Sequence, residues 1–128
     1  MFRDEVAAAA RAVRAAFAVV NYDGNAAYGH AHNAVEALVM AQTHTQQLSG
    51  WRTLGQMLHS ADPEISEDRV AELYASCQYG RHVKVTWAAK HLPAGGPLNP
   101  LACCVLAARI LRAYVQATGS GDLVAPSG

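Results

Sequence analysis

The sequence predicts an all-α domain, a compact bundle of four helices, or of five if Gly50 interrupts the second. Three observations favour this fold class. Apolar residues recur at spacings of three and four along most of the chain, which places them on one face of a helix. Of the 128 residues, 26 are alanine, the best helix former. No two segments show the alternating pattern expected of a pair of strands.

The first helix is expected from about Arg3 to Val20. Asp4 and Glu5 suit the positive end of its dipole. Turn-forming residues at 21–25 end it. Its apolar side chains gather on one face and are Phe2, Val6, Ala9, Val13, Phe17 and Val20.

The second helical segment is expected over residues 26–48, and helical spacing resumes over 51–59. Ser49 and Gly50 separate the two stretches. Glycine costs about 1 kcal/mol relative to alanine in a helix interior. We therefore expect a break or a kink at Gly50.

The third segment is expected to run from about Pro63 or Ser66 to His91, with Asp62 as a candidate N-cap. Apolar and polar residues alternate over 83–87, which is the period of a strand. An isolated strand would leave its backbone groups unpaired, and no partner strand is found elsewhere. We therefore expect a helix with a kink at Gly80, followed by a Pro- and Gly-rich loop at 92–98.

The last helix has the clearest boundary signals in the chain. Asn99 is a favoured N-cap, Pro100 suits the first turn and Gly119 suits the C-terminal stop. Residues 1–119 are expected to form one domain. Residues 120–128 show no core pattern and are expected to form a flexible tail.

Between its boundaries the last helix is nearly apolar all round, apart from a stripe of Arg109, Arg112 and Gln116. Such a helix must be buried on most sides. It either lies at the centre of the bundle or has an outer face that another subunit covers. The residues expected at that subunit interface are Leu106, Ile110 and Tyr114.

Composition excludes several classes of protein. The apolar fraction of 52% is too high for a disordered chain, and ten basic against ten acidic residues lack the excess of a general nucleic-acid binder. Acidic residues are nevertheless concentrated at positions 62–72, and basic residues and histidines at positions 81–91. A neutral total therefore permits a polarised surface, and one alternative function is nucleic-acid binding through Arg81, Lys84 and Lys90.

A metal-dependent enzyme is a second alternative. His32 and Glu36 are one helical turn apart and could share an ion, given further ligands from another helix. His44 lies about 18 Å farther along the same helix than His32 and cannot reach that ion. The simpler interpretation is that these are polar residues near a helix start, and no cofactor is expected.

Cysteine usage indicates the compartment. Cys77, Cys103 and Cys104 lack the spacing of a zinc site, and as free thiols on apolar helices they behave as small hydrophobic residues. Free thiols favour the cytoplasm. The longest apolar stretch, 101–108, is far shorter than the roughly 20 residues that span a bilayer. We therefore expect a cytoplasmic protein without membrane contact.

Arg52 and His59 enclose six residues. The pair resembles the R-x₄₋₆-H motif of HEPN-type ribonucleases, which are small helical bundles that dimerise. The resemblance implies that Arg52 and His59 meet at a dimer interface and cleave RNA without a metal. It covers these two positions only.

Spare apolar helix surface is most often covered by self-association, commonly as a two-fold dimer. The main expectation is therefore a small homo-oligomerising assembly or adaptor protein, a homodimer that also binds another protein. Light scattering and an RNA-cleavage assay of His59→Ala would separate this expectation from the enzyme alternatives.

Overall fold

The computed structural model describes residues 3–43 and 48–120, and within these ranges the chain is all-α. The expected count of four to five helices is too low, because the described part contains six α-helices and one 3₁₀ turn. Residues 121–128 of the expected tail, and His44, lie outside the described residues. The elements are α1 (Arg3–Val19), α2 (Gly24–Thr43), α3 (Leu48–Leu58), α4 (Glu67–Gly80), α5 (Val85–Ala88), η1 (Ala89–His91) and α6 (Pro100–Thr118).

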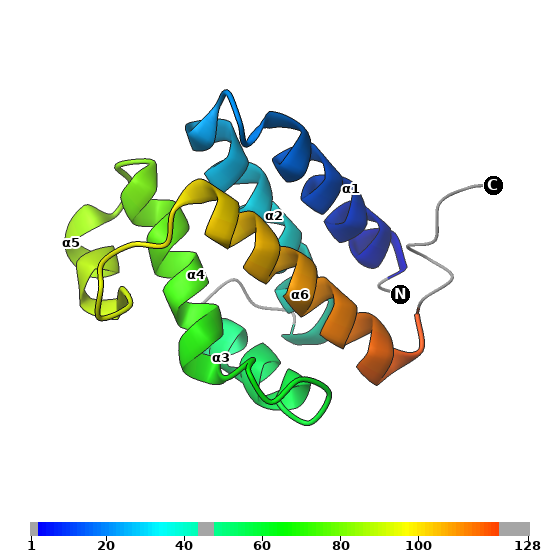
Figure 1. The fold of residues 1–128 in the computed structure, drawn as a ribbon. Coiled ribbons are helices and arrows are strands. Elements are labelled where there is room, and N and C mark those ends of the chain that lie inside the picture. The colour runs from blue at the N-terminus through cyan, green and yellow to red at the C-terminus, as the bar shows by residue number, and fades with distance from the viewer. Residues whose placement is uncertain (1–2, 44–47, 121–128) are drawn as a thin grey trace.

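The first helix is confirmed, and α1 packs along α2 (Figure 1). The turn between them ends at Asp23, whose carboxylate accepts a hydrogen bond from the backbone N–H of Ala26 at 3.0 Å and so caps α2. Phe17, expected in the buried face, is 40% exposed. The buried face of α1 instead consists mainly of small residues, Val6, Ala9, Ala10, Val13 and Ala16.

The break expected at Gly50 is wrong. Gly50 is buried inside α3, which runs from Leu48 to Leu58 without interruption. Trp51 is fully buried against the core. Burying a large side chain contributes about 1.5–3 kcal/mol, which exceeds the roughly 1 kcal/mol cost of a helical glycine. Tertiary packing therefore outweighs the low helix propensity of Gly50.

Of the two expected starts of the third segment, the later one, near Ser66, is confirmed. Ser66 is the N-cap of α4, and its hydroxyl accepts a hydrogen bond from the N–H of Arg69 at 3.1 Å. The helix ends at Gly80, where a Cβ would lie 2.3 Å from the ring of Tyr28, so the two helices approach closely at this point. The expected helix through residues 81–91 is wrong, since a turn separates α4 from the short α5 and η1.

That turn contains two non-glycine residues with left-handed backbone conformations, His82 at φ 60° and Lys84 at φ 48°. The Cβ of an L-residue is crowded in this region, at a cost of roughly 1–2 kcal/mol. Both side chains are exposed, so neither gains packing energy in return. The reversal of the chain after Gly80 therefore carries local strain.

Replacing Lys84 by glycine should relieve this strain. We expect Lys84→Gly to raise the free energy of unfolding by about 0.5–1 kcal/mol in urea denaturation, since glycine adopts positive φ without penalty. Thr86→Gly, at an exposed helical position in α5, is the matched control and should lower it by a similar amount. Equal effects of the two substitutions would contradict the backbone assignment.

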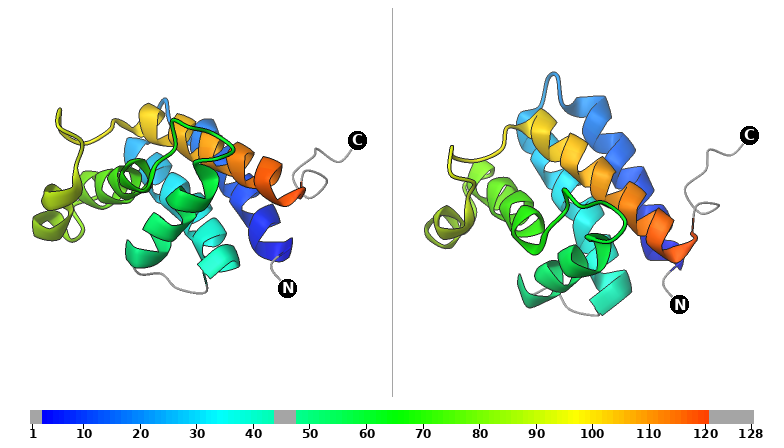
Figure 2. Two further views of the ribbon diagram at one scale, coloured as in Figure 1. Left: turned by 90° about the horizontal axis from the view of Figure 1, so that it is seen from below. Right: turned by 60° about the horizontal axis from the view of Figure 1, so that its bottom comes forward.

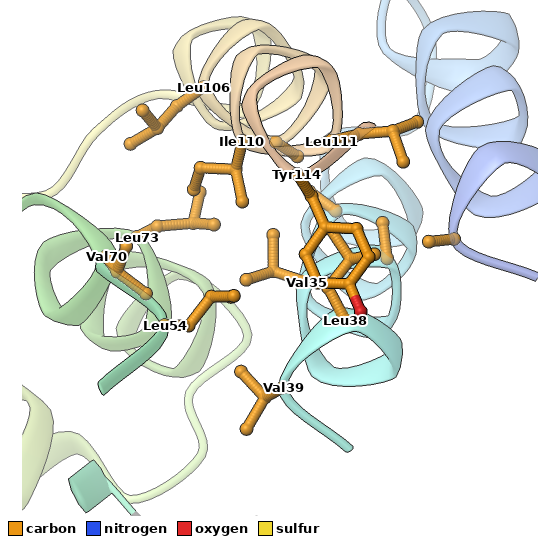
Figure 3. Packing of buried hydrophobic residues seen from close by; sticks show 14 of the residues in the cluster. Val35, Leu38, Val39, Leu54, Val70, Leu73, Leu106, Ile110, Leu111 and Tyr114 are labelled. Carbon is orange, nitrogen blue, oxygen red and sulfur yellow. The ribbon is translucent and has the colours of Figure 1, made fainter. Parts of the chain in front are cut away.

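The core lies between α2, α3, α4 and α6, whose apolar side chains point toward a common centre (Figure 3). Helix α2 contacts α1, α3, α4 and α6, whereas α5 packs chiefly on α4 and η1. Two further views place α5 and η1 at the edge of the molecule opposite α1 (Figure 2). The residues of the core labelled in the close view are Val35, Leu38, Val39, Leu54, Val70, Leu73, Leu106, Ile110, Leu111 and Tyr114.

The boundaries of α6 are confirmed. The side chain of Asn99 accepts a hydrogen bond from the N–H of Ala102 at 2.8 Å, and Gly119 ends the helix at φ 69°. Cys77, Cys103 and Cys104 are free and buried, as expected of core residues. Hydrogen bonding to Cys103 and burial both raise the pKa of the Cys77 thiol, so it stays protonated.

Candidate functional site

A chain of aromatic rings connects the interior of the bundle with the η1 segment. The ring centroids of His32 and Trp51 are 5.3 Å apart, and Tyr74 lies 5.2 Å from His32 and 4.5 Å from Trp51. Tyr74 meets Trp87 edge to face at 5.2 Å, and Trp87 stacks on His91 at 4.5 Å. These contacts fix the positions of both histidines, one buried and one beside the surface.

His32 occupies the inner end of this chain and is buried. Its Nε2 lies 3.2 Å from the side-chain amide nitrogen of Gln78 and 4.0 Å from a carboxylate oxygen of Glu36. Burial is the main cause, and the nearby cations Arg81 and Lys84 add to it, so that the pKa of His32 is lowered to about 4. A neutral imidazole is therefore the stable form at neutral pH.

His32 and Glu36 thus lie near one another, as a shared metal ion requires. Stable protein sites for transition metals need three or four ligands. Among the described residues, no group of three or more His, Cys, Asp or Glu side chains is arranged to hold an ion. In the part of the chain that the structure describes, the Glu36 carboxylate makes a weak polar contact with the buried imidazole of His32.

Arg52 lies near the middle of α3 and His59 directly follows its last residue, so the two are roughly 10 Å apart along the helix axis. Each lines a different surface depression, and the ring nitrogen Nδ1 of His59 lies 2.8 Å from the carbonyl oxygen of Ile65. This contact holds His59 against the loop before α4. The two side chains do not meet within one chain.

The three basic candidates separate into two groups. Arg81 donates from Nε to the carbonyl oxygen of Cys77 at 3.2 Å, and both Arg81 and Lys84 lie close enough to His32 to affect its titration. Lys90 belongs to η1 and shares a pocket with Arg52. The structure therefore brings together Arg52 and Lys90, which sequence spacing had assigned to different hypotheses.

That pocket has a volume of about 290 Å³ and lies between α3, α4 and the segment that follows α5. Its lining residues are far apart in the sequence and have no shared motif. Only knowledge of how α3 packs on α4 could have revealed it. Its charged lining consists of Arg52, Asp68, Glu72 and Lys90, and His91 adds an imidazole.

The side of α6 expected to bind another subunit faces inward. Leu106, Ile110 and Tyr114 are buried in the core of the single chain, so their side chains are not available to a partner. The opposite side exposes Leu101 and Val105, each at 52%. Apolar residues surround most of this helix, and the sequence-based choice fell on residues that the fold buries.

A groove of about 580 Å³ runs along the outer side of α6, and Val105 and Ala108 line it. Arg109 spans its edge: Nη2 donates to Asp62 at 3.1 Å, and Nη1 lies 2.6 Å from Glu64. The hydrogen bond from Arg109 lowers the pKa of Asp62. Asp62, expected as a helix cap, therefore joins the α3–α4 loop to α6 instead.

Within the described residues, α6 is the one helix whose length and apolar composition would suffice to cross a membrane. In the fold, its inner side packs on α1, α2, α3 and α4, and its outer side carries Arg109 and Arg112. Core helices of globular proteins have the same composition.

No protein family, no curated protein and no solved structure matches this chain.

Proposed function

We propose that this chain is a small homodimerising assembly protein whose subunit interface is the outer side of α6. The observation that supports this proposal is the exposure of Leu101 and Val105 on adjacent turns of the same helix. Small residues flank them, because Ala102 and Ala108 line the grooves on this side. Exposed branched side chains next to small ones allow two helices to pack closely.

A second copy of the chain suits this surface by charge. The acids Asp62 and Glu64 lie beside the bases Arg109 and Arg112. A two-fold axis presents the same surface from both copies, so equal numbers of acids and bases allow each sign to meet its opposite. Arg112 forms no ion pair among the described residues and is therefore available to a carboxylate of the second copy.

The dimer would display two copies of the α5 edge to other proteins, which is the adaptor role that the sequence suggests. Three free buried thiols support a cytoplasmic location for it. The proposed interface uses only α6 and the loop between α3 and α4, so the pocket beside η1 stays open in the dimer.

Sedimentation velocity and light scattering test the dimer directly. We expect the wild-type protein to have twice the 13.6 kDa chain mass at micromolar concentration. Val105→Glu should weaken the dimer at least about 30-fold, because an unpaired charge would be buried in the interface. Tyr22→Glu is the matched control, since Tyr22 is exposed in the α1–α2 turn, and it should leave the mass unchanged.

Two results would contradict this proposal. A wild-type protein that stays monomeric at millimolar concentration has no such interface. A Val105→Glu variant that dimerises as well as Tyr22→Glu would place the interface elsewhere. Circular dichroism of both variants checks that the fold is retained.

A further inference from the structure

The pocket beside η1 carries charges of both signs on separate elements. Arg52 projects from α3, whereas Lys90 and His91 belong to η1. Asp68 and Glu72 lie one turn apart on α4. The pocket therefore presents cationic groups from two elements and carboxylates from a third.

These charges are not used to hold the fold together. Within the described part of the chain, Arg52, Asp68 and Lys90 form no ion pair and no side-chain hydrogen bond. Glu72 has one partner, Arg69, whose Nη1 lies 3.6 Å from Oε2. Two cations and one acid in a single pocket are thus left to solvent or to a ligand.

One wall of this pocket is fixed by buried contacts. The loop after η1 is attached at Leu98, whose N–H donates to the hydroxyl of the buried Ser76 at 3.0 Å and whose carbonyl oxygen accepts from the hydroxyl of Tyr28 at 2.8 Å. His91 is stacked on Trp87, and its Nδ1 lies 3.2 Å from the carbonyl oxygen of Trp87. A wall held in this way loses little entropy when a ligand binds.

We propose that this pocket binds a small zwitterion, an amino acid or a short peptide. The ligand's carboxylate lies between Arg52 and Lys90, and its ammonium group lies beside Asp68 and Glu72. Hydrogen bonds between charged groups are about twice as strong as neutral ones, and a ligand with both signs satisfies both sets of side chains. A purely anionic ligand would meet the two carboxylates, and a purely cationic one would meet Arg52 and Lys90.

The test uses ¹⁵N-labelled full-length protein and four probes. Gly-Leu carries both charges, N-acetyl-Gly-Leu lacks the ammonium group, Gly-Leu amide lacks the carboxylate, and inorganic phosphate is a simple anion. We expect Gly-Leu to shift the amide signals of residues 90–92 and 94 with a Kd of about 1 mM. Each of the other three should bind at least about tenfold more weakly. Free L-leucine as a fifth probe distinguishes an amino acid from a peptide as the preferred source of the zwitterion.

Variants connect the binding to the named side chains. Arg52→Gln and Asp68→Asn, both at exposed positions, should each weaken Gly-Leu binding about tenfold. Arg14→Gln, an exposed arginine on α1, is the matched control and should leave it unchanged. Absence of binding, phosphate binding as tight as that of Gly-Leu, or equal affinity of Arg52→Gln and Arg14→Gln would each overturn the proposal. None of these outcomes bears on dimerisation through α6.

Discussion

Acidification from pH 7 to pH 4 should lower the free energy of unfolding by as much as about 3 kcal/mol through His32 alone. In the folded protein, burial lowers the pKa of His32 to about 4, whereas the unfolded chain takes up this proton near pH 6.5. Between these values the unfolded chain binds more protons, so stability decreases as the pH falls. The loss begins near pH 6.5 and is complete below about pH 4.

The control is His32→Gln, which keeps a hydrogen-bonding side chain but does not titrate. Urea denaturation of both proteins from pH 4 to pH 7 should show a steeper dependence for the wild type, because carboxylates such as Asp62 titrate equally in both. The C2 proton of His32 gives a direct measurement by NMR. An ordinary imidazole pKa near 6.5, or parallel pH profiles, would show that His32 is not buried as a neutral group.

The surroundings of His32 explain why this expectation does not follow from sequence. His32 and Glu36 are visible as a pair at helical spacing, and that spacing suggested a metal. Gln78, Trp51 and Tyr74 come from other helices, and their contacts make the site a buried imidazole among aromatic rings. Local spacing predicts neighbours on one helix, whereas burial and pKa depend on several helices at once.

The two boundaries of α6 were predictable because their signals are local. In α6, Asn99 and Gly119 act through hydrogen bonds and backbone angles within a few residues, so sequence alone places both boundaries. The helices in the middle of the chain were not predictable in the same way. The helical conformation of Gly50 and the turn after Gly80 depend on where Trp51 and Tyr28 pack, which no pattern in the neighbouring sequence reveals.

The same reasoning applies to the surfaces. Apolar residues occur on both sides of α6 in the sequence, and only the fold shows that Leu101 and Val105 are exposed whereas Ile110 is buried. The pocket beside η1 joins Arg52 to Lys90 across 38 positions of sequence, counted from 52 to 90. Side chains that only helix packing brings together have no characteristic spacing in the sequence. Both surfaces can therefore be recognised only in the folded structure.

Gly55→Ala should destabilise the protein by about 2–3 kcal/mol, the largest loss expected for so small a change. The backbone of Glu67 at the start of α4 lies against Gly55 of α3. A Cβ on residue 55 would lie 2.6 Å from the Cα of Glu67 and 2.7 Å from the carbonyl oxygen of Ser66. These are backbone atoms at the N-terminus of α4, where Ser66 caps the helix, so they cannot move aside without loosening the cap.

Gly29→Ala provides the opposite expectation within the same fold. Its nearest neighbour would be the guanidinium end of Arg81 at 3.6 Å, which is ordinary contact with a flexible side chain. Alanine in place of a helical glycine should therefore stabilise α2 by about 0.5–1 kcal/mol. In both thermal and urea denaturation, the midpoint of unfolding should fall for Gly55→Ala and rise for Gly29→Ala. If Gly55→Ala were as stable as Gly29→Ala, α3 and α4 could not pack as closely as the structure shows, and the wall that carries Arg52 in the pocket beside η1 would be misplaced.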